Sequence, residues 1–255
     1  MSQVLEVSDI SVWFGGLAAL QGVSFHVEPG ECLGMIGSNG AGKSTLVDVI
    51  CGARYPATGE IALNGTNLRR EGPRARSLRG LARTFQGLRL FYDLTARENI
   101  LVRAEALGVD QPLLKTALVL KELALEDVAD VQTSSLPLAR QKAIAVGQAI
   151  VTTPLITILD EPLAGLDQQG VKMVQDLIRS RISDGRTSII LIDHNVSAVA
   201  AVASRIVFMH NGVSMLSGPT SDVLRSSEVS ELYFGKTSSA RQVISAAVKP
   251  DGLSR

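Results

Sequence analysis

A glycine-rich stretch at residues 37–45 follows an apolar run and opens a helix pattern. Its residues are Gly37, Ser38, Asn39, Gly40, Ala41, Gly42, Lys43, Ser44 and Thr45. Glycines let a backbone wrap phosphate groups, so that successive N–H groups point inward at the start of a helix. In the pattern G-x-x-x-x-G-K-[ST], the lysine reaches the β- and γ-phosphates and the Ser44 hydroxyl can ligate Mg²⁺. The stretch therefore predicts a site for a nucleoside triphosphate.

Two carboxylates follow a second apolar run, LITILDE at residues 155–161. In a parallel sheet, the carboxyl ends of the strands face the ligand crevice. There Asp160 can hold Mg²⁺ together with Ser44, and Glu161 can polarise the water that attacks the γ-phosphate. An Asp-Glu pair is ambiguous alone, because helix N-caps use the same residue types. The phosphate-binding loop makes hydrolysis the better interpretation.

Four short motifs complete an ordered set. They are VWFGG at 12–16, ARTFQ at 82–86, AGLD at 164–167 and LIDHN at 191–195. With the phosphate-binding loop and the two carboxylates, they make the chain resemble the ATP-binding subunits of ABC transporters over nearly all of residues 4–235. The resemblance implies an ATPase that uses ATP and Mg²⁺.

The same resemblance implies roles for single residues. Gln86 and His194 would act in catalysis with Glu161, and Gln86 would also approach Mg²⁺ beside Ser44 and Asp160. Asp167 would lie close to the nucleotide. Phe14 sits where the family stacks an aromatic ring on adenine, although the neighbouring Trp13 can do the same. A lone histidine after a strand is more often structural, but the ordered set reverses that interpretation for His194.

Residues 82–100, ARTFQGLRLFYDLTARENI, are similar to the ATPases of branched-chain amino acid importers, and so is the ending ELYFG at 231–235. This similarity implies transmembrane permease subunits as partners, a substrate-binding protein acting indirectly, and a peripheral position on the cytoplasmic face of the inner membrane. The region around Gln86–Asp93 would pass motion to the permeases. Two alternatives remain open: the ATPase subunit of a lipid or drug exporter, and a nucleotide-binding regulator with little hydrolysis.

The signature loop of the family, L-S-[GY]-G-Q, is altered here to Leu136-Pro137-Leu138-Ala139-Arg140. In the family its serine and glycine contact the γ-phosphate held by the opposite subunit of a dimer. Proline has neither a hydroxyl nor an N–H group, and the Cβ of Ala139 hinders close backbone approach. Arg140 replaces a glutamine that supports the loop, although an arginine can contact phosphate itself. We therefore expect a heterodimer with a second, non-identical ATP-binding subunit of intact signature, in which one of two sites is impaired.

These motifs need a particular set of elements to position them. Alternating runs at 4–7, 23–27, 32–36 and 60–63, with Asn64-Gly65 as a hairpin turn, predict an antiparallel lobe. Beyond residue 155, strands at 155–159, 188–192 and 205–209 alternate with helices at 168–183 and 196–203, which predicts a parallel sheet. Between them, Leu113, Ala117, Leu120, Leu123 and Ala124 recur at helical spacing. The expected fold is an α/β P-loop NTPase of the ABC ATPase type: an antiparallel β lobe, a RecA-like parallel-sheet core and a helical subdomain at about 95–150. The ATPase domain would span 1–235, followed by a mobile tail at 236–255.

Composition excludes other classes. The 25 basic and 25 acidic residues balance, so we expect no nucleic-acid partner, and the apolar runs are too short to span a membrane. The seven arginines of residues 68–89 are expected on a solvated face. Cys32 and Cys51 lack metal-ligand spacing and are expected to be reduced core thiols. No N-terminal stretch has the basic, apolar and small-residue order of a signal peptide.

Overall fold

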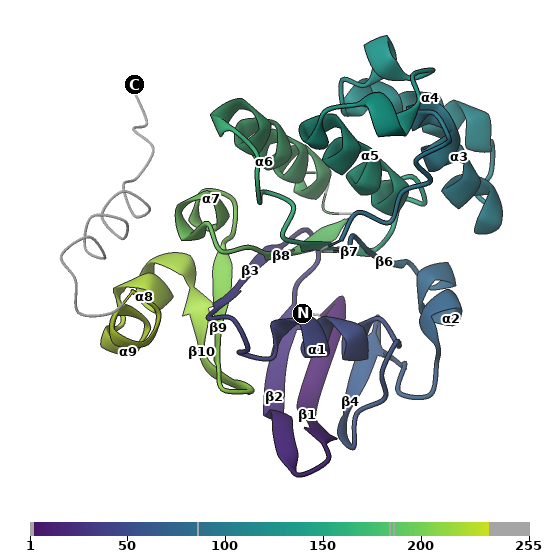
Figure 1. Ribbon diagram of the computed structural model, residues 1–255. Coiled ribbons are helices and arrows are strands. Elements are labelled where there is room, and N and C mark those ends of the chain that lie inside the picture. Colours follow the sequence, from purple (N-terminus) through teal and green to yellow (C-terminus); the bar gives the residue numbers. More distant parts are fainter. Residues whose placement is uncertain (1–2, 86, 184, 186, 235–255) are drawn as a thin grey trace.

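The chain folds around two β-sheets (Figure 1). The computed structural model describes residues 3–85, 87–183, 185 and 187–234. The first sheet has four antiparallel strands in the order β2-β1-β4-β5. They are β1 (Leu5–Phe14), β2 (Leu17–Val27), β4 (Thr58–Leu63) and β5 (Thr66–Asn67). Asn64 and Gly65 form the β4–β5 turn with positive φ angles of 45° and 74°, as a two-residue hairpin requires. The predicted antiparallel lobe is confirmed for the runs at 4–7, 23–27 and 60–63, whereas the run at 32–36 forms β3 of the second sheet.

The second sheet has six strands in the order β10-β9-β3-β8-β7-β6. Five are mutually parallel: β3 (Cys32–Gly37), β6 (Leu81–Arg83), β7 (Ile156–Asp160), β8 (Ser188–Ile192) and β9 (Arg205–His210). The sixth, β10 (Val213–Pro219), pairs antiparallel with β9. Every residue of β3, β7 and β8 is buried, because a parallel sheet is covered on both faces.

Helices surround the six-stranded sheet (Figure 1). α1 (Lys43–Ile50) follows β3, and α2 (Pro73–Leu78) precedes β6. Three helices and two short 3-10 turns gather at one end: α3 (Ala96–Ala106), α4 (Pro112–Glu122), η1 (Glu126–Val128), η2 (Thr133–Ser135) and α5 (Leu138–Ile150). The remaining elements are α6 (Gln168–Ile182), α7 (Val196–Ala200), α8 (Thr220–Arg225), α9 (Ser227–Val229) and the π-helical turn η3 (Ser230–Phe234).

The two faces of the six-stranded sheet belong to different hydrophobic cores. In β3, Cys32 and Ile36 pack toward the core shared with the helices, whereas Leu33 and Met35 pack toward the core shared with α1 and the antiparallel sheet. This alternation follows from the two-residue period of a strand. The α/β fold expected from the sequence is therefore built around β3, whose end carries the phosphate-binding loop.

The apolar residues that recur at helical spacing over 113–124 do not share one buried face. The helix forms, but α4 buries Thr116, Val119 and Leu120, whereas Leu113 is 67% exposed. Ala117 and Ala124 are exposed too. Leucines occur on both sides of α4, so their spacing fits two faces, and packing against α3 and α5 selects one.

The expectation of a fully solvated arginine cluster is wrong for Arg76, which is 0% exposed. Its guanidinium group donates to the carbonyl oxygens of Val49 (2.7 Å) and Ile50 (2.6 Å) at the end of α1, and to those of Leu68 (2.6 Å) and Glu71 (2.8 Å). The positive charge of Arg76 also lies at the negative end of the α1 dipole, which is a favourable interaction. Gly52 leaves the necessary room, because a Cβ there would lie 2.8 Å from Nε of Arg76.

The tail expected at 236–255 lies outside the described residues. Within the described ranges, no helix combines the length and the apolar character needed to cross a membrane.

Candidate nucleotide site

The loops that follow β3, β7 and β8 meet at one edge of the six-stranded sheet. β8 lies between β3 and β7, so the three loops come from adjacent strands although they are distant in sequence. Together with the β1–β2 region they line a cavity of about 640 Å³. Among the residues predicted from the sequence, the cavity brings together residues 39–45, Asp160, Glu161 and His194.

The phosphate-binding loop leads directly into α1. Gly42 is the N-cap, with φ 98°, and no side chain caps the first turn. A Cβ at Gly42 would lie 2.8 Å from the carbonyl oxygen of Ala19, so both conformation and space require glycine. The first N–H groups of a helix have no intrahelical partner, and here they face the cavity lined by residues 39–45.

Lys43 is buried at the floor of this loop. Its Nζ donates to the carbonyl oxygens of Gly37 (2.6 Å) and Ser38 (3.0 Å). Burial lowers the pKa of Lys43, while the carboxylates of Glu161 and Asp160 act in the opposite direction. The loop carbonyl oxygens thus already orient the ammonium group of Lys43. The loop and this ammonium group would bind phosphate together.

Asp160 ends β7 and is 7% exposed. Its backbone N–H donates to Oγ1 of Thr84 (3.0 Å), and Nη2 of Arg83 lies 4.0 Å from its Oδ2. Arg83 also pairs with Asp48 of α1 at 2.8 Å, so one guanidinium group connects β6, α1 and β7. Burial raises the pKa of Asp160, and Arg83 opposes that rise. A buried carboxylate of this kind favours a neighbouring cation.

The donor set of the cavity suits Mg²⁺. Asp160 supplies a carboxylate and Ser44 a hydroxyl, and Mg²⁺ prefers oxygen ligands with substrate phosphates completing its shell. No cluster of three or more His, Cys, Asp or Glu side chains suited to a metal exists in the part of the chain that the structure describes. The carboxylate of Asp160 and the hydroxyl of Ser44 fit a Mg²⁺ ion whose remaining ligands are phosphate and water oxygens.

Glu161 and His194 face each other across the β7–β8 edge. Nε2 of His194 lies 2.9 Å from Oε1 of Glu161. Glu161 adopts a left-handed backbone with φ 51°, and its N–H donates to the carbonyl oxygen of Ile192 (2.8 Å). Asp193, next to His194, accepts from the N–H groups of Leu163 and Asn195 (both 3.0 Å).

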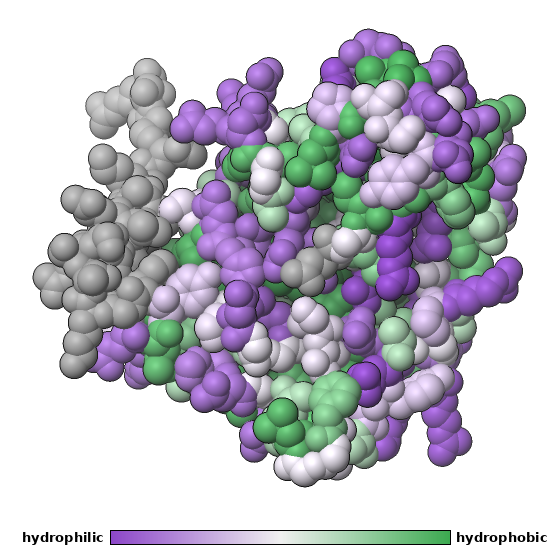
Figure 2. Space-filling view, viewed as in Figure 1, coloured by the Kyte–Doolittle hydropathy of each residue, from purple (hydrophilic) through white to green (hydrophobic). Residues whose placement is uncertain are grey.

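Phe14 ends β1 and is 44% exposed, and it is not among the residues that line the 640 Å³ cavity. The guanidinium group of Arg54 lies 4.3 Å from its ring centroid. Trp13 and Leu17 are also exposed, at 48% and 71%. In Figure 2, hydrophobic side chains gather at the lower end of the molecule, where Figure 1 places the β1–β2 hairpin. An apolar platform thus borders the cavity, with one face of the Phe14 ring covered by Arg54.

Asp167, predicted to lie close to the nucleotide, is not among the residues that line the cavity. Asp167 is the N-cap of α6, where its Oδ1 accepts from the N–H of Gly170 (2.8 Å). Gln86 lies outside the described residues.

The altered signature loop leads into α5. Pro137 is the N-cap, with φ −59°. Gln141 supports the loop from inside by donating to the carbonyl oxygens of Thr133 (3.1 Å) and Leu136 (2.9 Å). Arg140 points to its own subunit: it pairs with Asp127 at 3.0 Å and donates to the carbonyl oxygen of Ala124. Arg140 is therefore engaged within the chain rather than directed at a phosphate.

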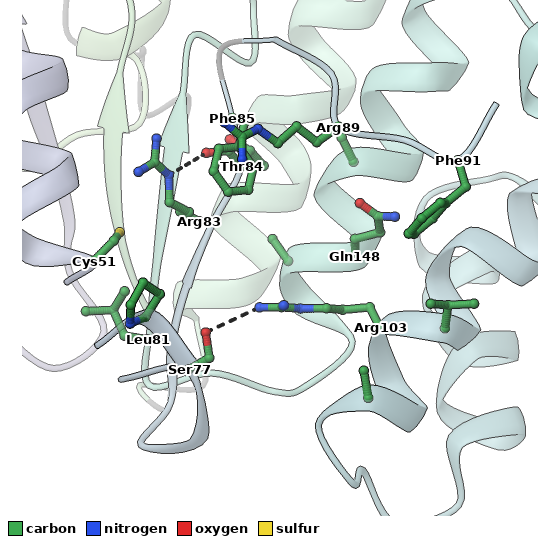
Figure 3. A pocket seen from close by; sticks show the side chains of 15 residues that line it. Cys51, Ser77, Leu81, Arg83, Thr84, Phe85, Arg89, Phe91, Arg103 and Gln148 are labelled. Atoms are coloured by element: carbon green, nitrogen blue, oxygen red, sulfur yellow. Dashed lines mark hydrogen bonds between the residues drawn. The ribbon is translucent and has the colours of Figure 1, made fainter. Parts of the chain in front are cut away.

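A separate groove of about 350 Å³ lies between α2 and β6 on one side and α3 and α5 on the other (Figure 3). Phe85 lies between Arg83 and Arg89, whose guanidinium carbons are 4.4 and 4.2 Å from its ring centroid. Arg103 reaches across the groove to Oγ of Ser77 at 3.4 Å. Burial lowers the pKa of Arg103. No carboxylate pairs with Arg103 among the described residues, so the groove presents an uncompensated cation between apolar walls.

Sequence reasoning missed the roles of Arg83, Arg103 and Gln141. Arg83 stands inside the ARTFQ motif, and Gln141 follows the altered signature directly, so motif position was a usable signal for both. Arg103 lies in a helix with no special pattern, and only packing reveals it.

The chain is similar to several known proteins. The model of the ABC transporter family matches residues 20–164. The chain is 31% identical over 250 residues to the high-affinity branched-chain amino acid transport ATP-binding protein BraF of Pseudomonas aeruginosa, covering 91% of this chain and 98% of BraF. It is 30% identical over 236 residues to the Nod factor export ATP-binding protein I of Rhizobium etli, covering 91% and 74%. A crystal structure of an ATP-binding cassette of an ABC transporter in its ADP conformation superposes with a TM-score of 0.83 at 26% identity, covering 92% of this chain and all of that one.

Proposed function

The chain belongs to the ABC transporter family of ATPases, and from this premise we propose that it hydrolyses ATP to energise an importer of branched-chain or related amino acids. The observation that carries the proposal is the single cavity shared by the phosphate-binding loop, Asp160, Glu161 and His194. The similarity to BraF over almost the full length of both chains supports the class of cargo.

The geometry supports a division of labour. The loop amides and Lys43 bind the β- and γ-phosphates, and Phe14 offers a ring face to adenine beside the cavity. Ser44, Asp160 and Gln86 would hold Mg²⁺, which neutralises charge on the phosphates when bound. Glu161 accepts the proton of the attacking water, and His194 orients the Glu161 carboxylate from 2.9 Å. Asp167 is held at the start of α6 by its N-cap hydrogen bond, six residues after Glu161. Its proposed role is to lie close to the nucleotide.

The site is half of a composite one. The family's signature loop completes the site of the opposite subunit, so the altered loop at Pro137 weakens the partner's site and leaves this chain's Glu161 intact. We infer a heterodimer with a second ATP-binding subunit of intact signature. One site would hydrolyse ATP at full rate and the other slowly.

The groove of Figure 3 is the proposed docking site for a transmembrane permease subunit. Its apolar walls suit a short helix, and the Arg103 cation suits a carboxylate on that helix. The segment 87–93 borders the same groove through Arg89 and Phe91, so nucleotide-dependent movement there would reach the permease. This arrangement implies a peripheral position on the cytoplasmic face of the inner membrane, with a substrate-binding protein acting on the far side.

The proposal is tested by Glu161→Gln, which keeps the size of the side chain and removes the base. We expect Mg-ATP affinity to persist while turnover falls by about 10²–10⁴-fold. A mutant with unchanged turnover would falsify the assignment of Glu161 and favour a nucleotide-binding regulator. Wild-type chain that binds Mg-ATP but never hydrolyses it, alone or with its partner subunit, would favour the same regulator.

Export is the second candidate, because the Nod factor export protein aligns over most of this chain. Transport measurements in cells that lack this chain distinguish import from export. Reduced uptake of labelled leucine supports import, whereas normal uptake with increased retention of a lipid or drug supports export.

A further inference from the structure

Lys142 lies one turn inside α5, and its side chain leaves the helix toward the turn after β7. Its Nζ lies 3.1 Å from the carbonyl oxygen of Glu161 and 3.4 Å from that of Pro162, and it also donates to the carbonyl oxygen of Ala164. An ammonium group has three donors, so these three oxygens match its full capacity. Lys142 thus connects α5 to the Glu161–Ala164 turn.

That turn holds an unusual backbone conformation. Glu161 has φ 51°, a region that residues other than glycine seldom occupy and that persists only when the surroundings enforce it. On one side, Oδ2 of Asp193 accepts from the N–H of Leu163 (3.0 Å), and the N–H of Glu161 donates to Ile192 (2.8 Å). On the other side, Lys142 binds the carbonyl oxygens. The turn that carries the Glu161 carboxylate is thus contacted on both sides.

The charge of Lys142 lies among negative groups. Burial lowers its pKa, and the carboxylates of Asp193 and Glu161 act in the opposite direction. Three carbonyl dipoles point at the same nitrogen, which favours a cation over a neutral side chain of similar length.

We propose that Lys142 is a positioning residue for hydrolysis, which holds the Glu161–Ala164 turn so that the Glu161 carboxylate faces His194 and the phosphate-binding loop. Lys142 does not itself touch the nucleotide cavity lined by residues 39–45. Its loss should therefore change turnover and leave nucleotide affinity intact.

A second consequence rests on the proposed function. α5 begins with the altered signature loop, four residues before Lys142, and that loop would contact the nucleotide of the opposite subunit. Movement of α5 on the partner's nucleotide would reach this chain's Glu161 through Lys142. The residue would then couple the two sites of the dimer.

The test compares Lys142→Met, Lys142→Arg and the matched control Lys172→Met, a change at an exposed lysine of α6. In hydrogen exchange on the purified full chain, we expect the peptide covering 161–167 to exchange about tenfold faster in Lys142→Met, because a charge-assisted contact is lost. In the hydrolysing assembly, we expect kcat to fall by about 10–100-fold, since small misplacements of a base are costly. The Mg-ATP Kd should stay within about twofold. Lys142→Arg should restore most of both properties, and Lys172→Met should match the wild type.

Exchange in the 161–167 peptide that does not change in Lys142→Met overturns the proposal. So does unchanged kcat, or a weakening of Mg-ATP affinity as large as the loss of turnover, which would indicate general loss of structure. Hydrogen exchange needs no hydrolysis, so a chain without ATPase activity would contradict the proposed function and still test the contact.

Discussion

Nε2 of His194 lies 2.9 Å from Oε1 of Glu161, and the ladder between β7 and β8 explains why. Asp160 pairs with Ile192 in register, so the residues that follow each strand emerge side by side at the same edge of the sheet. The site therefore depends on strand register as much as on the two side chains.

Replacing His194 by alanine should lower ATP turnover by about 10²-fold, because the Glu161 carboxylate loses the partner that orients it. Mg-ATP affinity should change little, since the loop amides and Lys43 remain. Steady-state kcat and equilibrium binding of a fluorescent ATP analogue measure the two effects. Equal loss of binding and turnover would mean that His194 acts mainly on the nucleotide.

The double change Pro137→Ser and Ala139→Gly should raise hydrolysis by this chain in the absence of its partner subunit. It supplies a hydroxyl, an N–H group and backbone access at the start of α5. Charge-assisted hydrogen bonds of about 1.5–3 kcal/mol correspond to about tenfold or more in rate. The measurement is kcat at saturating ATP, at several protein concentrations. A double mutant that is no faster than the wild type would argue against a signature defect and thus against the asymmetric heterodimer.

Replacing Arg76 by methionine should destabilise the fold by about 3 kcal/mol or more, because three buried carbonyl oxygens and one partly buried carbonyl oxygen lose their donor. Arg74→Met, two residues away on an exposed position of α2, is the matched control and should cost under about 0.5 kcal/mol. Urea unfolding gives both values. Equal midpoints for the two variants would show that Arg76 contributes no more than an exposed arginine.

Arg103→Glu should weaken binding to the permease subunits, because it places a carboxylate where the groove now offers a cation. Loss of at least tenfold in affinity is expected, about 1.4 kcal/mol. Arg225→Glu on α8 makes the same charge change near the opposite edge of the six-stranded sheet, beside β10, and serves as the control (Figure 1). Pull-down of the permeases from detergent extracts compares the variants. Equal recovery would remove the groove as the docking site.

Cys32 and Cys51 should resist thiol reagents in the folded chain. Burial raises the pKa of each thiol to about 12, so at pH 8 only about one in 10⁴ is a thiolate. A colour-forming disulfide reagent should release signal from both cysteines only after unfolding. Fast reaction of either thiol under native conditions would contradict the placement of that cysteine in the core.

Local patterns predicted those parts of the fold and site that depend on contiguous residues. The strand Ser188–Ile192 has its predicted bounds, because an uninterrupted apolar run has one natural position in a buried parallel sheet. β1 was predicted only at 4–7, since its irregular pairing near Asp9, with φ 54°, breaks the alternation. The cavity-lining residues 39–45, Asp160, Glu161 and His194 could be predicted because each belongs to a motif only a few residues long.

Contacts between distant segments could not be predicted. Arg76 stands in a run of arginines that resembles a solvated face, and its burial depends on the ends of α1 and β5 meeting α2. Lys142 looks like a surface residue of α5 until β7 places Glu161 beside it. Long polar side chains such as these satisfy backbone carbonyl groups that only the assembled fold brings together.

The strand order has a consequence for how the chain acquires its site during synthesis. In the six-stranded sheet, β3 has two neighbours, which are β8 and β9. Both are translated about 150 residues or more after β3. The phosphate-binding loop therefore leaves the ribosome attached to a strand whose edges have no partner in that sheet. When β8 arrives it pairs with β3 and β7 together and brings Asp160 and Glu161 to the loop. A nascent chain that ends before Ser188 lacks the strand that joins the loop to Asp160 and Glu161, so we expect stabilisation by ATP across these groups only once β8 has been made.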